Sequence, residues 1–248
     1  MNIRNAAAPE LPRGAEAFAQ THWSMVAALR SGSDDSQRAL TQLCLSYWFP
    51  VYAYVRRCGH APSLAQQITQ AFFGDLIDAM RRDDPRAVGQ FRQFLLNRLA
   101  RFLGEGWANQ RPGQPDAKLS PPLALEDLES RLQIARAEGS PEHSFQRGFA
   151  LEVLDRAMNR LRIEAQQGGR QRMFELLEPY LTCEPEPGQY QHLADQLHSA
   201  PMAVVVAIKR LRQRFRELVD DELTETVASA EELDAERDAL LAILGDAR

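Results

Sequence analysis

The sequence predicts an all-α protein in which two helical domains are joined by a proline-rich linker and followed by an acidic C-terminal helix. Three observations support this prediction. Apolar residues recur at the three- and four-residue spacing of one helix face through most of the chain. No segment alternates apolar and polar residues for long enough to build a sheet. Four prolines and a glycine fall within residues 111–123, where they oppose helix continuation.

The first domain, residues 18–110, contains three amphipathic segments. Their apolar faces run from Leu40 to Val51, from Ile68 to Met80 and from Phe91 to Trp107. Pro50 lies inside the first of them, and we expect it to break or kink that helix because proline lacks a backbone donor and clashes with the preceding turn. Residues 111–139 are predicted to form the linker, with 111–123 as its most mobile part.

The second domain, residues 140–223, opens with Ser140 and Pro141, which are favoured as the N-cap and the first residue of a helix. That helix is expected to end at Gly168-Gly169. A further short helix is expected from Arg172 to Leu181.

The most informative segment follows, over residues 191–216. A short helix ends near Leu197, a turn contains Ser199-Ala200-Pro201, and a second helix runs into a cluster of five basic residues: Lys209, Arg210, Arg212, Arg214 and Arg216. This order is typical of a helix–turn–helix, whose second helix enters the major groove while cations neutralise phosphates. The alternative is a solvated surface helix, because cations also suit a helix C-terminus.

The formal net charge of −5 is unevenly distributed. Residues 217–248 carry −9, so residues 1–216 carry +4, and the total argues little against DNA binding. The acidic tail, residues 224–248, is predicted to form a helix with an apolar stripe of Leu233, Leu240, Leu241 and Leu244. It is either a docked helix with a solvated acidic face, or a flap that competes with DNA for the preceding basic helix.

Other functional classes find no support in the sequence. No apolar run is long enough to cross a bilayer, and no secretory signal is visible at the N-terminus, so no membrane association is expected. The three cysteines fit neither a disulfide framework nor a zinc site, which favours a reducing, cytoplasmic location. Motifs for nucleotide binding, metalloprotease or serine-hydrolase chemistry are absent. We therefore expect neither an enzyme nor a bound cofactor or metal.

The order of motifs resembles the ECF-type sigma factors of RNA polymerase, within the sigma-70 superfamily, and above all the longer ECF-like group that is rich in planctomycetes. The resemblance covers roughly residues 21–244. It rests on these segments: His22 to Val26, Tyr47 to Arg57, Gly59 to Pro62, Ile68 to Phe73, Gln90 to Leu96, Phe174 to Leu181, and Val206 to Arg216.

The resemblance implies a role for each domain. The first would be a region-two-like bundle that grips the β′ clamp helices of the polymerase core and holds the melted −10 promoter element. The implied polymerase contacts are Ser63, Gln66, Gln67, Thr69, Gln70 and Phe73, and the implied −10 contacts are Tyr52, Arg56, Arg57, Arg92 and Arg98. The second would be a region-four-like helix–turn–helix that reads the −35 element and touches the β flap. There Met202 and Val205 would join the five cations listed above as DNA contacts.

The chain departs from the family in three places. Residues 63–71 lack the acids that are usual on the clamp-binding helix, and residues 108–110 lack the usual basic run. Val205 stands where a base-reading Arg is common, so it touches a thymine methyl group or is buried.

Three hypotheses follow from these departures. The first is a sigma factor whose core binding is gated by phosphorylation of Ser63 or Thr69 by a Ser/Thr kinase, or by a partner such as an anti-sigma factor. The second is a sigma-derived adaptor or decoy that does not initiate transcription. The third is a simple DNA-binding regulator.

Overall fold

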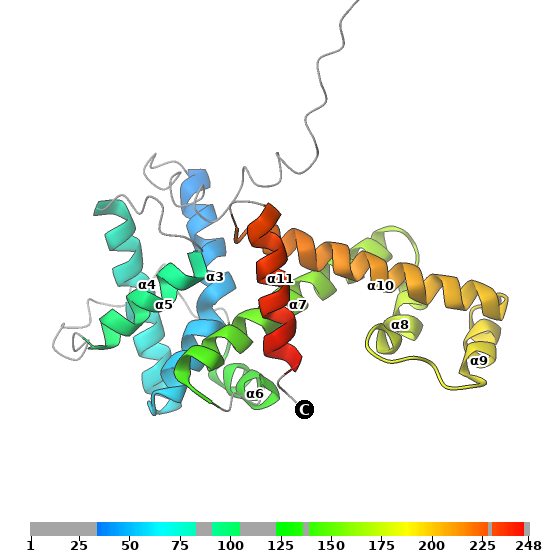
Figure 1. The fold of residues 1–248 in the computed structure, drawn as a ribbon, viewed down its shortest axis with the longest axis horizontal. Coiled ribbons are helices and arrows are strands. Elements are labelled where there is room, and N and C mark those ends of the chain that lie inside the picture. The colour runs from blue at the N-terminus through cyan, green and yellow to red at the C-terminus, as the bar shows by residue number, and fades with distance from the viewer. Residues whose placement is uncertain (1–33, 83–90, 105–122, 136–138, 228–229, 246–248) are drawn as a thin grey trace, which may run out of the picture. The chain divides into compact units, whose positions relative to one another are not determined.

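The structure is a computed structural model that describes residues 34–82, 91–104, 123–135, 139–227 and 230–245. Helices joined by turns account for these residues, with no strand among them, which confirms the all-α prediction (Figure 1). The residues predicted to be most mobile, 111–123, fall almost wholly outside the described ranges, as do the motif at 22–26 and Trp107.

The chain divides into two compact units. Unit 1 comprises residues 1–149 and 223–248, and unit 2 comprises residues 150–222. These bounds differ from the predicted domains, because residues 140–149 and the C-terminal tail both belong to unit 1.

Unit 1 contains α3 (Asp34–Arg57), α4 (Pro62–Arg82), α5 (Phe91–Gly104), α6 (Leu125–Ala135), the start of α7 (Pro141–Gln167) and α11 (Ala230–Gly245). Helix α3 packs on α4, and α6 contacts both. Aromatic rings fill the core between them. Trp48 stacks on Phe73 with ring centroids 5.3 Å apart, and Tyr47 stacks on Phe149 at 5.6 Å. Most described residues of the predicted apolar faces, among them Tyr47, Trp48 and Phe73, are therefore core residues.

The expected break at Pro50 is not found, because α3 continues through it. Its neighbours explain the continuity. The residues on both sides of the proline are almost fully buried: Phe49, Val51 and Tyr52. Their packing stabilises the helix and offsets the one backbone hydrogen bond that proline cannot donate. Helix α7 also approaches closely here: a Cβ atom on Gly148 would lie 3.0 Å from the Cα of Pro50.

Helix α6 corrects the predicted extent of the linker. Residues 125–135 form a helix within the stretch assigned to linker, and Leu128 and Ala135 are buried. The prolines that suggested an irregular segment end at Pro122, so they do not oppose a helix that begins at Leu125.

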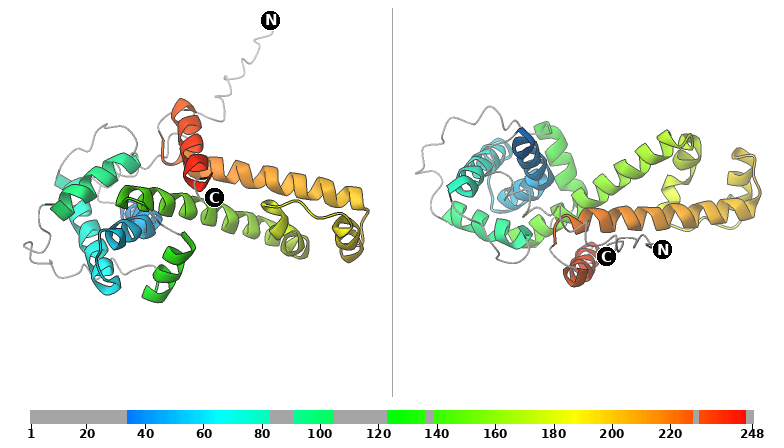
Figure 2. Two further views of the ribbon diagram at one scale, coloured as in Figure 1. Left: turned by 60° about the horizontal axis from the view of Figure 1, so that its bottom comes forward. Right: turned by 90° about the horizontal axis from the view of Figure 1, so that it is seen from above.

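Unit 2 contains the remainder of α7, then α8 (Gln171–Leu177), the 3₁₀ helix η3 (Glu178–Leu181), α9 (Gln189–Gln196) and all but the last two residues of α10 (Pro201–Thr224) (Figure 2). Two predicted helix ends are confirmed. The hydroxyl oxygen of Ser140 accepts a hydrogen bond from the N–H of His143 at the start of α7. At the other end, α7 stops at Gln167, and Gly169 adopts the left-handed conformation (φ 64°).

The acidic tail forms α11 and docks within unit 1. Leu240 is buried, and Glu236 is buried in an ion pair with Arg92 on α5 at 2.8 Å. The docked-helix alternative agrees with these contacts. The buried carboxylate of α11 pairs with Arg92 of α5. This contact does not support the alternative in which the tail competes with DNA for the basic residues of α10.

Candidate nucleic-acid interface

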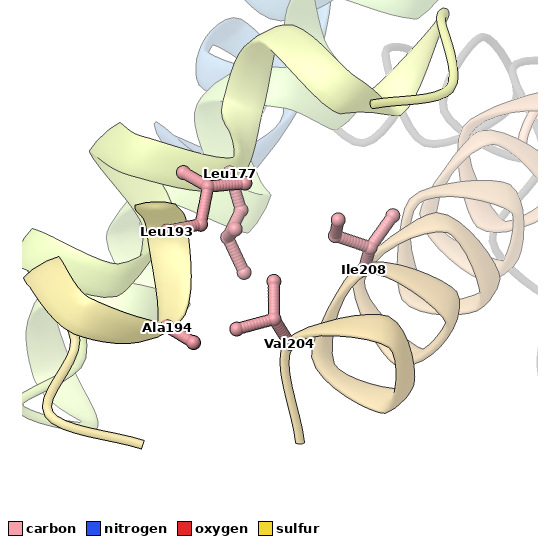
Figure 3. Packing of buried hydrophobic residues seen from close by; sticks show 5 residues of the cluster. All are labelled: Leu177, Leu193, Ala194, Val204 and Ile208. Atoms are coloured by element: carbon pink, nitrogen blue, oxygen red, sulfur yellow. The ribbon is translucent and has the colours of Figure 1, made fainter. Parts of the chain in front are cut away.

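A small core holds the helix–turn–helix of unit 2 together. Leu177 from α8, Leu193 and Ala194 from α9, and Val204 and Ile208 from α10 form one buried cluster (Figure 3). Val204 and Ile208 are four residues apart, so they lie on one face of α10. Their burial fixes which side of α10 faces inward and which faces solvent.

The turn between α9 and α10 stops one helix and starts the next. The N–H of Ser199 donates to the carbonyl of Ala194 at 2.9 Å, and the N–H of His198 donates to that of Asp195 at 3.3 Å. This pair of bonds, with His198 in the left-handed conformation (φ 49°), is a Schellman motif. Helix α10 then begins at Pro201, the last residue of the predicted turn.

The outward face of α10 carries one exposed stripe. Its members recur at helical spacing and change from aliphatic to polar and charged along the helix: Met202, Val205, Val206, Lys209, Arg210, Gln213, Arg216 and Glu217. The one acid among them, Glu217, pairs with Arg214. Val206 and Gln213 were not among the predicted contacts, although the three- and four-residue spacing from Met202 would have found them. Val205 is exposed, which removes the buried alternative for that residue.

Two of the five predicted cations are structural. Arg212 donates from Nε to the carbonyl of Tyr180 at 2.9 Å and from Nη2 to that of Cys183 at 2.6 Å, and it also pairs with Glu184. Arg214 makes a two-point contact with Glu164 on α7 at 2.7 and 2.9 Å. Hydrogen bonds from Arg214 hold the pKa of Glu164 below its usual value. Arg212 and Arg214, which are predicted to contact DNA, are therefore held by partners within unit 2.

Three of the predicted cations remain open to a ligand. Lys209, Arg210 and Arg216 are exposed. Among the described residues, the ion pairs of α10 are made by Arg212 and Arg214 and include none of these three. All three lie on the outward stripe of α10.

The predicted −10 contacts in unit 1 are engaged inside that unit. Arg56 donates from Nε and Nη2 to the two carboxylate oxygens of Glu129 at 2.7 and 2.9 Å, and the hydroxyl of Tyr52 donates to the same carboxylate. These hydrogen bonds lower the pKa of Glu129, that from Arg56 most. Burial, followed by the contact with Glu129, raises the pKa of Tyr52.

The other predicted −10 cations are held in the same way. Arg57 donates to the carbonyl of Gly139, Arg98 pairs with Asp75 at 2.8 Å, and Arg92 pairs with Glu236 while lying over the ring of Phe149. Burial raises the pKa of Glu236, although the charge of Arg92 opposes that shift. Each of the predicted −10 contacts therefore already has a partner within unit 1.

The predicted polymerase contacts divide by burial. Ser63 and Gln67 are exposed, Gln66 and Gln70 are half-buried, and none of them is charged. Thr69 and Phe73 are fully buried, and the hydroxyl of Thr69 donates to the carbonyl of Ala65 at 2.8 Å. Neither Thr69 nor Phe73 is thus presented to a polymerase, and Thr69 is not presented to a kinase.

Comparison with protein-family models, curated proteins and solved structures found no match to this chain. Among the described helices, none combines the length and apolarity needed to cross a membrane.

Proposed function

We propose that this protein is a helix–turn–helix transcription factor of the sigma type. Unit 2 binds duplex promoter DNA through α10, and the whole chain directs the core RNA polymerase to that promoter. The observation that carries the proposal is the outward stripe of α10, whose three exposed cations pair with no acid in the described part of the chain, beside a core that fixes its orientation. The order of sigma-like motifs in the sequence supports the polymerase part.

Of the two candidate phosphorylation sites in unit 1, Ser63 and Thr69, only Ser63 is accessible to a kinase. Ser63 is exposed and is the second residue of α4, whose first turn contains no acid. A phosphate there adds about −1.5 to −2 charges near the positive end of the helix dipole. The phosphorylated form then supplies negative charge where a sigma factor usually carries acids for the clamp.

The test is run-off transcription with purified core polymerase and the full chain, unmodified and phosphorylated at Ser63. Transcripts are expected from the phosphorylated form, and Thr69→Val, which keeps the shape of a buried side chain, should leave this response unchanged. Equal transcription without phosphate would remove the switch but keep the sigma function. Absence of transcripts and of polymerase binding in every form would rule out the sigma function.

The second candidate is a sigma-derived adaptor or DNA-binding regulator that does not initiate transcription. The internal pairing of Arg56, Arg92 and Arg98 favours it, because melted DNA needs accessible cations. DNA retention by the full chain without transcripts would favour a regulator, and polymerase binding without either would favour an adaptor.

A further inference from the structure

The N-terminal turns of α10 present apolar side chains. Met202 is 71% exposed, and Val205 and Val206 are each 40% exposed. In a recognition helix, residues at these positions contact the edges of the bases. These three residues occupy the first two turns of α10.

Their outward orientation is fixed by the core. Val204 and Ile208 are turned towards Leu193 and Ala194 of α9 (Figure 3). Rotating α10 to bury Val205 and Val206 would expose Val204 and Ile208 and open the core of unit 2. The aliphatic side chains therefore remain available to a ligand while the unit stays folded.

The chemistry of these side chains restricts what they can recognise on DNA. The two valines neither donate nor accept hydrogen bonds, and the methionine thioether is only a weak acceptor, so none of the three makes a bidentate contact with guanine or adenine. The one apolar group that a base pair presents in the major groove is the C5-methyl group of thymine. Lys209 and Arg210 follow on the same stripe, where they match the phosphates that flank such a group.

We propose that Met202, Val205 and Val206 recognise thymine methyl groups, so that the site of this protein is defined by thymine positions rather than by guanine. This inference rests on the proposed DNA binding of unit 2. The occupant is DNA rather than a protein or a second copy of the chain, because the same stripe continues into three exposed cations that complement phosphate.

The experiment selects bound duplexes from a randomised library with the full chain, alone and with core polymerase. Each thymine in the selected site is then replaced by deoxyuridine, which pairs identically and lacks only the methyl group. Loss of one buried methyl contact is expected to weaken binding about fourfold. Val205→Ala should abolish the effect at one thymine, and it should fold because alanine favours helix more than valine does.

Two variants serve as controls. Ile163→Ala removes an aliphatic side chain of α7 that is 50% exposed, and it should keep the full deoxyuridine effect. Lys209→Gln should weaken binding to thymine and deoxyuridine duplexes by the same factor, because a phosphate contact carries no base information.

The remaining outcomes separate the inference from the proposed function. Tight binding that is indifferent to deoxyuridine would overturn methyl recognition and leave DNA binding intact. Retention of no duplex, with or without polymerase, would overturn both. Dimers that Val206→Ala dissociates would show that a second copy occupies the aliphatic surface, which also overturns the inference.

Discussion

Units 1 and 2 use their arginines differently. In unit 1, Arg56, Arg92 and Arg98 each contact a carboxylate of the same unit. In unit 2, Arg212 and Arg214 do so as well, but Lys209, Arg210 and Arg216 are exposed and have no such partner among the residues that the structure describes. A basic residue in a familiar motif therefore indicates a DNA contact only when no nearby acid already pairs with it.

The largest expected effect concerns the buried pair in unit 1. Glu236→Ala leaves Arg92 buried without its carboxylate, and breaking such a pair from one side costs about 3–5 kcal/mol. Urea unfolding should show this loss. The matched control is Asp234→Ala, which removes an exposed acid of α11 paired with Arg237, and its effect should be small. Similar losses in both variants would mean that Arg92 does not depend on Glu236.

Replacing both members of the pair should have a much smaller effect. Burial raises the pKa of Glu236 despite its contact with Arg92, which indicates that desolvation outweighs attraction. We therefore expect the double variant Arg92→Met/Glu236→Leu to recover most of the stability lost in Glu236→Ala. A double variant as unstable as the single one would show that the charges themselves are required.

The contact between Arg56 and Glu129 predicts a pH dependence. The pKa of Glu129 is lowered in the folded state, so its contribution is present above the unfolded value of about 4.3 and is lost as the pH falls through the folded value. The difference in unfolding free energy between wild type and Glu129→Gln should shrink over that acidic range. A constant difference would mean that the carboxylate charge of Glu129 does not stabilise unit 1.

The smallest effect is a gain at the start of α10. Ala200 precedes the helix, and its carbonyl accepts a hydrogen bond from the N–H of Val204 at 3.3 Å, but its side chain has no oxygen to cap a backbone N–H. Ala200→Ser is expected to stabilise unit 2 by about 1 kcal/mol, seen as a higher Tm. No gain would suggest that Ser199 already acts as the cap.

The sequence was sufficient to predict helix starts, ends and caps that depend on neighbouring residues. The helix start at Pro201, the end of α7 at Gly168-Gly169 and the cap by Ser140 all depend on residues within a few positions of one another. Helix α6 was not predicted, because the prolines that precede it led to a linker that was extended to residue 139.

The candidate sites were less predictable because they depend on distant partners. Arg56 and Glu129 are 73 residues apart, and Arg92 and Glu236 are 144 apart. The periodicity of apolar residues within a segment does not indicate which distant charged residues will pair. Thr69 is different, because it lies three and four residues before Phe72 and Phe73, so the apolar face of α4 could have indicated its burial.

The central claim is that the free cations of unit 2 bind the phosphates of DNA, and the salt dependence of duplex binding tests it most directly. Each lost phosphate contact lowers the slope of log affinity against log salt by about 0.9. We expect Lys209→Gln/Arg210→Gln to lower the slope by about 2, and Arg237→Gln, whose arginine pairs with Asp234 on α11, to leave it unchanged. An unchanged slope in the double variant would contradict the account, because Lys209 and Arg210 would then be only a solvated part of α10.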